Sequence, residues 1–176
     1  MSTPLILLFA ARNRFEIPQA DEVDKIAALV KLVGNNIRTP KAVADELQFD
    51  LRQSSYYGEA AEILGLLNRK GGYTLTELGS KLFSSDEKTS SKIIVCALLN
   101  YPIIAQIASI LQSKLVASVS KSDIESLVSR EGEVHGTTIQ RRAQTILAWL
   151  KWLHQNSHVL AVENDIVKLE TQQKII

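Results

Sequence analysis

The residues of this chain that could do chemistry gather at the start of one amphipathic stretch, TTIQRRAQTILAWLKWLH (137–154). Its first third carries hydroxyls, a glutamine and two adjacent arginines, whereas its last third is rich in Leu and Trp. Arginine offers a bidentate fork to guanine, glutamine offers one to adenine, and threonine presents a hydroxyl or a methyl group to a base edge. Hydroxyls and free backbone N–H groups at the start of a helix also suit phosphate. These residue types predict a surface that contacts nucleic acid.

Helical periodicity decides which of these side chains face outward. The apolar residues that fall within about 40° of one line predict the buried face, and they are Ile139, Ala143, Ile146, Leu150 and Leu153. The opposite side of the first turns carries Thr137, Arg141, Gln144 and Thr145, and Arg142 lies at the edge of the buried stripe. We expect base or phosphate contact from the polar residues Thr137, Thr138, Gln140, Arg141, Arg142 and Gln144.

Charge is distributed unevenly along the chain. The 176 residues carry a net charge of +1, so composition alone does not indicate nucleic acid. Between Thr137 and Gln155, however, there are three basic residues and no acid. The alternative to DNA contact is a solvated helix start whose arginines pair with Glu131 or Glu133 just upstream.

A second candidate contact helix is LRQSSYYGEAAEILGLLNRK (51–70), with Asp50 as its N-cap. Its charges balance, and its periodicity places Ser54, Ser55 and Gly58 outward and Gln53, Tyr56 and Tyr57 toward the core. Arg52, Gln53, Ser54 and Ser55 form a secondary set for nucleic-acid contact. Arg52 and Gln53 suit structural hydrogen bonds equally well.

The elements that must position these side chains follow one plan twice. In the first half, helical spacing predicts a helix over 21–34 that stops at Gly34, a short helix with Thr39 as N-cap and Pro40 as its first residue, and the helix over 51–70. A glycine turn, a strand at 73–75 and a helix over 76–83 follow. Three helices before a turn and a strand are the order of a winged helix, a variant of the helix-turn-helix.

The second half repeats this order after a polar run at 84–92 and an apolar helix, KIIVCALL (92–99), in which Cys96 is expected to be buried. Helices follow at 103–112, at 122–130 with Ser122 and Glu125 as a capping box, and at 137–155. Two strands then flank Asn164-Asp165, a favoured type I′ turn pair.

These patterns predict a mainly α fold with small β-wings, made of tandem winged-helix units. The expected domains are an N-terminal strand or arm (1–19), winged helix 1 (20–84), a linker helix (85–102), winged helix 2 (103–170) and a tail (171–176). The apolar run Leu5 to Ala11 lacks a preceding cationic region and is too short for a membrane helix, which needs about twenty residues. We therefore expect a cytoplasmic protein with no membrane partner.

Three stretches, LRQSSYYGEAAEILGLL, YTLTELGSKL and TTIQRRAQTILAWLKWL, resemble the winged-helix region of type II restriction endonucleases and related restriction-modification proteins. The resemblance covers about 15–169 and implies that this region recognises DNA while a separate nuclease domain cuts it. The residues that carry it are Arg52, Gln53, Tyr56, Tyr57, Ala60, Leu64, Gly65, Leu66, Leu75, Thr76, Gly79, Thr138, Arg141, Arg142, Thr145, Trp149 and Trp152.

The sequence departs from such nucleases in its acidic residues. Those nucleases hold Mg²⁺ with an Asp followed some way on by Asp/Glu-x-Lys. The nearby match in this sequence, Asp86-Glu87-Lys88, lies in a polar linker. We expect a non-catalytic protein without metal or cofactor that binds double-stranded DNA, as a stand-alone recognition or accessory subunit or as a regulator, with a nuclease or other protein subunit as a further partner. The alternatives are a winged-helix protein-interaction module or subunit without DNA contact, and an enzyme that uses Asp86, Glu87 and Lys88 as a metal site.

Overall fold

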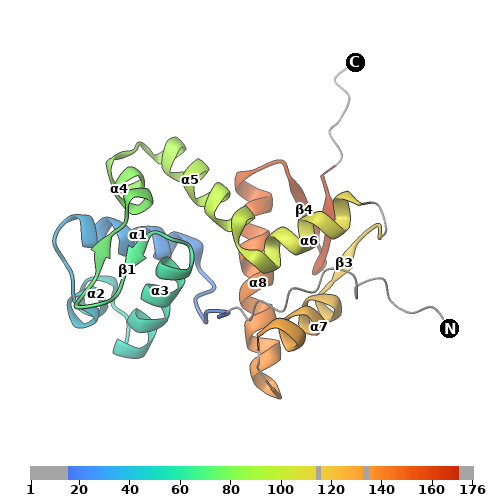
Figure 1. Ribbon diagram of the computed structural model, residues 1–176, viewed down its shortest axis with the longest axis horizontal. Coiled ribbons are helices and arrows are strands. Elements are labelled where there is room, and N and C mark those ends of the chain that lie inside the picture. The colour runs from blue at the N-terminus through green and yellow to red at the C-terminus, as the bar shows by residue number, and fades with distance from the viewer. Residues whose placement is uncertain (1–15, 114–115, 133–134, 171–176) are drawn as a thin grey trace.

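The computed structural model of the chain describes residues 16–113, 116–132 and 135–170 (Figure 1). Within these ranges the protein is mainly helical, with eight helices and two small antiparallel sheets. The expected mainly α fold with small β elements is confirmed. The predicted N-terminal strand or arm lies outside the described residues except for 16–19, which are irregular, and so do the tail (171–176) and Glu133.

Local caps define the elements of the first half. Thr39 accepts a hydrogen bond from the backbone N–H of Ala42, and Asp50 forms a capping box with Gln53. The elements are α1 (Val23–Gly34), α2 (Pro40–Leu47), α3 (Leu51–Ile63), β1 (Leu67–Asn68), β2 (Thr74–Leu75) and α4 (Glu77–Ser84). The predicted starts of α2, α3 and α4 are therefore confirmed, whereas α1 begins at Val23, two residues after the predicted start.

The carboxyl end of α3 differs from the prediction, which extended this helix to Lys70. Gly65 has a φ of 72°, and the N–H groups of Gly65 and Leu66 bond to the carbonyls of Glu62 and Ala61. This double hydrogen bond around a left-handed glycine ends a helix. Leu67 consequently starts β1 and pairs with Leu75 of β2.

One face of α3 is also corrected. Ser54 and Gly58, predicted to face outward, are buried. The Ser54 hydroxyl donates to the carbonyl of Pro40 at 2.7 Å, and Gly58 lies against the Tyr73 ring, whose hydroxyl donates to the Ser54 carbonyl. The small side chains let α2 and Tyr73 pack closely here, which moves the buried stripe of α3 and leaves Gln53 exposed.

The second half contains one three-stranded sheet, in the order β3-β5-β4, with all pairs antiparallel. Asn164 and Asp165 have φ values of 50° and 60°, which confirms the turn that was expected between β4 and β5. The elements are α5 (Glu87–Asn100), α6 (Pro102–Gln112), β3 (Val119–Ser120), α7 (Lys121–Glu131), α8 (Thr137–Asn156), β4 (Leu160–Glu163) and β5 (Ile166–Leu169).

Two details of the second half differ from the predictions. The N-cap of α7 is Ser120, which forms its capping box with Asp123, so the helix begins before the predicted Ser122 cap. Cys96, expected to be buried, is exposed. Only part of the surface of α5 is covered by neighbouring elements, and Cys96 lies on the open part.

The two halves share one hydrophobic core. Figure 1 shows α5 running from α4 toward α6 and α8. The irregular segment before α1 is also part of this join, because Ile17 and Ala20 are buried and the Tyr101 hydroxyl donates to the Glu16 carbonyl at 2.9 Å. The ring of Tyr101 meets that of Trp149 edge-on, at 5.4 Å between centroids. Residues far apart in sequence therefore hold the halves together.

Among the described helices, none is by itself long and apolar enough to cross a membrane. The consecutive helices α5 and α6 together have the length and apolar composition of a membrane span, but the chain bends by 78° between the two helices.

Candidate nucleic-acid interface

Helix α8 carries the predicted contact residues, and its buried face is largely as expected. Ala143, Ile146, Leu150 and Leu153 are fully buried, and Ile139 is partly buried. Thr145 is a correction, because it is only 4% exposed although it was predicted to face outward. Its hydroxyl donates to the Arg141 carbonyl one turn earlier, which satisfies this polar group inside the fold.

The amino end of α8 is open and polar. Thr137, Gln140, Arg141 and Gln144 are exposed, and Thr138 is half-buried. The N-cap is Gly136, with a φ of 59° and no side-chain hydrogen bond to the helix. The backbone N–H groups of Thr138 and Ile139 already donate to the carbonyls of His135 and Gly136, which leaves the N–H of Thr137 at the helix start for an outside acceptor.

These side chains border a surface depression of about 570 Å³, which we call the α8 hollow, lined by Gln19, Asp21, Thr137, Gln140, Arg141, Gln144 and Thr145. Arg141 has no ion pair with any residue that the structure describes. Of the two upstream acids named in the solvated-helix alternative, Glu131 pairs with Arg130 at 2.8 Å, and Glu133 lies outside the described residues.

Sequence reasoning missed Gln19 and Asp21. They belong to the irregular segment before α1, more than a hundred residues from Arg141, and no local pattern places them beside α8. Contacts across the fold decide their position. Only the three-dimensional packing of the segment reveals that a carboxylate borders the same depression as the arginine.

Two tryptophans of α8 bind this segment and the first turn of α1. Trp149 Nε1 donates to the Ala20 carbonyl at 2.7 Å, and Trp152 Nε1 donates to Asp24 Oδ1 at 2.9 Å. From α3, the Tyr57 hydroxyl donates to Asp21 Oδ1 at 3.3 Å. Burial, and then the charge of Asp21, raise the pKa of Tyr57, so its hydroxyl remains a donor at neutral pH. One oxygen of the Asp21 carboxylate is thus bound by Tyr57, and residues on either side of Asp21 are bound by the two tryptophans.

Arg142 occupies a different environment from Arg141. It is half-buried, and its Nε and Nη1 atoms are buried without a hydrogen-bond partner among the described residues. Its charge acts on Glu59 of α3 and on Tyr101, and burial raises the pKa of Glu59 although Arg142 partly offsets the increase. Arg142 therefore lies at the join of the two halves, where its position favours a structural role.

The secondary set on α3 is partly engaged in local structure. Ser54 is buried, and Gln53 accepts from the backbone N–H of Asp50 in the capping box. Arg52 Nε donates to the Tyr56 hydroxyl at 2.5 Å, with the guanidinium over the Tyr56 ring. Ser55 is exposed. The structure brings four predicted contact residues together in one depression, namely Arg141, Gln140, Gln144 and Thr137. The secondary set on α3 lies outside this depression.

Comparison with known protein families covers the α8 side of this site. Residues 25–158 match a family described as a domain of unknown function, DUF7226. The chain belongs to this family. The match extends from within α1 to just beyond α8, so it contains Arg141 and both tryptophans, whereas Gln19 and Asp21 precede it. No curated protein and no solved structure matches the chain.

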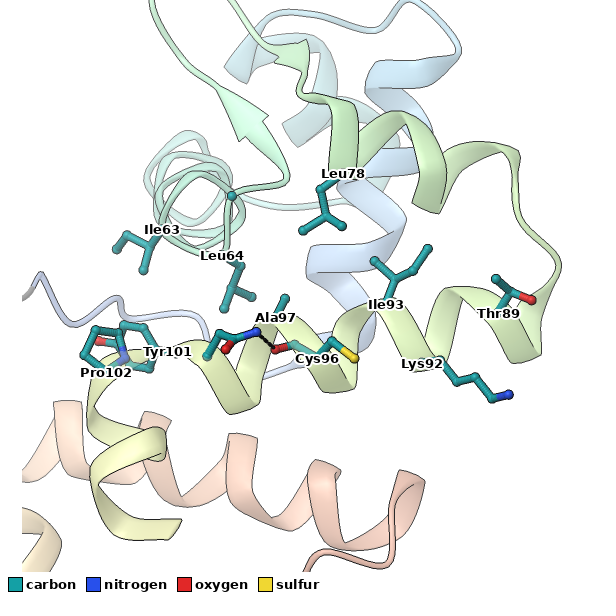
Figure 2. A pocket seen from close by; sticks show the side chains of 12 residues that line it. Ile63, Leu64, Leu78, Thr89, Lys92, Ile93, Cys96, Ala97, Tyr101 and Pro102 are labelled. Atoms are coloured by element: carbon teal, nitrogen blue, oxygen red, sulfur yellow. Dashed lines mark hydrogen bonds between the residues drawn. The ribbon is translucent and has the colours of Figure 1, made fainter. Parts of the chain in front are cut away.

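A second depression in the family region is apolar. It measures about 520 Å³ and lies between the end of α3, α4 and α5. Figure 2 shows Leu64, Leu78 and Ile93 around this space, with Cys96 and Lys92 along α5. Its lining offers little to a charged ligand and is of the kind that an apolar side chain fills.

The acidic run at 86–88 has a structural use. Asp86 is the N-cap of α5 and accepts from the backbone N–H of Thr89 at 2.8 Å, and this hydrogen bond lowers its pKa. Within 16–113, 116–132 and 135–170, no group of three or more His, Cys, Asp or Glu side chains is placed to hold a metal ion.

Proposed function

We propose that this protein is a non-catalytic double-stranded DNA-binding protein built from two winged-helix units, and that the amino end of α8 contacts the DNA. The observation that carries the proposal is the exposed guanidinium of Arg141, without an ion pair in the described residues, among the amides and hydroxyls of the α8 hollow. Donors of these types at the start of a third helix are what a helix-turn-helix protein presents to the major groove.

The topology of the second half supports a winged-helix unit. Its elements follow the order α6, β3, α7, α8, β4 and β5, and the strand between the first two helices joins the sheet next to the last strand. In that plan α8 is the third helix and the β4–β5 hairpin is the wing. The third helix of such units lies in the groove with its amino end at the bases.

The first half supports a repeat of the plan. Its helices α1, α2 and α3 precede the hairpin of β1 and β2. The backbone N–H of Tyr73 donates to the carbonyl of Arg38 at 2.7 Å, so the segment before α2 lies beside the segment that leads into β2. β3 occupies the equivalent place in the second half, beside β5.

The electrostatic part of the proposed contact is small. Lys151 of α8 pairs with Asp165 at 2.7 Å, and Arg142 is half-buried, which leaves Arg141 as the exposed cation of the contact end. Base edges and backbone N–H groups would therefore contribute a larger share than phosphate charge. We expect a low salt dependence, with roughly one to three phosphates neutralised.

A protein-interaction module is the second candidate function, and the apolar depression of Figure 2 favours it. An exposed apolar depression on a joining helix suits a partner's side chain. The resemblance to restriction-modification proteins makes a nuclease or other subunit a reasonable partner. In that case the protein would be a recognition or accessory subunit, and a regulator if it acts alone.

The test is an equilibrium titration of the full chain with a fluorescently labelled duplex at several salt concentrations. The proposal predicts saturable binding, with log K falling linearly and gently as log salt rises. Absence of duplex binding even at low salt would contradict the proposal and favour the interaction module. The same preparation incubated with a supercoiled plasmid and Mg²⁺ tests catalysis, and nicking would contradict the non-catalytic assignment.

A further inference from the structure

We infer that the α8 hollow recognises a G·C base pair, with Arg141 donating to guanine and Asp21 accepting from the cytosine amino group. The inference rests on the proposed DNA-binding function and names the base pair that this site would prefer. It starts from an observation that DNA binding alone does not explain, namely that a carboxylate is held in a depression that would face a polyanion.

The donors and acceptors of the hollow match one base pair. In the major groove, guanine presents two acceptors, N7 and O6, and its partner cytosine presents the N4 amino donor. A guanidinium supplies two donors in a fork, and a carboxylate supplies only acceptors. Arg141 and Asp21, which both line the depression, thus offer the complementary set.

The same pair of side chains disfavours A·T. Adenine presents one acceptor and one donor, and thymine presents the O4 acceptor beside a methyl group. A carboxylate facing O4 would place two acceptors together without a proton between them. The amides of Gln140 and Gln144 can both donate and accept, so they do not distinguish the pairs, and Asp21 is the discriminating group.

Asp21 is free to make this contact. The Tyr57 hydroxyl occupies Oδ1, and Oδ2 has no partner among the described residues. Its neighbours Ala20 and Asp24 are bound by Trp149 and Trp152, which belong to the same helix as Arg141. Residues on either side of the acid are therefore hydrogen-bonded to the helix that carries the arginine, which favours a fixed position of the two side chains for direct readout of a base pair.

The experiment selects bound duplexes from a randomised library with the full chain, and then measures affinity for the selected site and for versions with one base pair exchanged. The variants are Asp21→Asn and, as a charge-matched control outside the hollow, the exposed Asp45→Asn of α2. The wild type should select at least one invariant G·C pair, and an A·T exchange there should weaken binding roughly fivefold to hundredfold.

Asp21→Asn should reduce this preference at that one position without weakening binding to unselected duplex, while Asp45→Asn should keep the preference. Selection of no G·C position, or an unchanged preference in Asp21→Asn, would overturn the inference and leave DNA binding intact. Failure to bind any duplex would overturn the proposed function and this inference with it. The two failures are therefore distinguishable.

Discussion

Trp149 of α8 donates its indole N–H to the carbonyl oxygen of Ala20 at 2.7 Å, across 129 positions of sequence. Trp149 is fully buried, and so is Ala20. This bond attaches the segment before α1 to the helix that carries the proposed contact residues. It gives the α8 hollow its second wall.

Replacing Trp149 by Phe should destabilise the protein because it leaves the buried Ala20 carbonyl without its donor and opens space in the core. We expect a loss of about 2–4 kcal/mol in the free energy of unfolding, measured by denaturant titration. Trp152→Phe is the matched control, since its bond to Asp24 is exposed, and it should cost less than about 1 kcal/mol. Equal losses in the two variants would contradict this account of the join.

Two glycines in helices should respond differently to alanine. A Cβ at Gly79 would overlap the backbone carbonyl of Leu66, whereas a Cβ at Gly34 would meet the ring of Phe83, which is 38% exposed and can swing away. Gly79→Ala should therefore cost more than about 2 kcal/mol of unfolding free energy, and Gly34→Ala clearly less. Thermal and denaturant unfolding of both variants would check this order, and a reversed order would contradict it.

Glu59 gives a prediction about pH. Burial raises its pKa above the ordinary value of 4.5, and the charge of Arg142 only partly offsets the increase. Ionisation of Glu59 is therefore less favourable in the folded protein than in the unfolded chain, so Glu59 lowers stability above its raised pKa. This cost disappears as the pH falls from the raised pKa to below the ordinary value. Glu59→Gln, which resembles the protonated form, should stabilise the protein at pH 7.

The stability difference between Glu59→Gln and the wild type should shrink toward zero as the pH is lowered to the range in which Glu59 takes up its proton. Denaturant unfolding at a series of pH values measures it. Destabilisation by Glu59→Gln at neutral pH would mean that attraction to Arg142 outweighs the cost of burial.

The sequence was sufficient where a local signal decides the structure. The buried stripe of α8 follows from apolar spacing, and the turn at Asn164-Asp165 follows from the backbone preference of those residues. The end of α3 was also encoded locally, by Gly65, but the apolar residues beyond it continued the helical period and concealed the stop. The spacing of apolar residues alone does not indicate that a glycine adopts a left-handed backbone conformation and ends the helix.

The remaining errors are non-local in origin. Ser54 was assigned to the surface because it is polar, yet it is buried, since its hydroxyl finds the Pro40 carbonyl of α2. Asp21 was not considered for the site, because contacts with Trp149 and Tyr57 from two distant helices place its segment there. Such positions depend on which helices pack together, and the local pattern of a single sequence does not indicate which helices will be neighbours.

The most direct test of the central claim compares Arg141→Ala with Lys88→Ala in duplex binding at low salt. Lys88 is an exposed cation at the start of α5, so both variants lose one positive charge from the surface. Arg141→Ala should weaken binding by roughly fivefold to hundredfold with little change in melting temperature, and Lys88→Ala should bind nearly as the wild type does. Equal affinity of Arg141→Ala and the wild type would contradict the claim that the amino end of α8 contacts DNA.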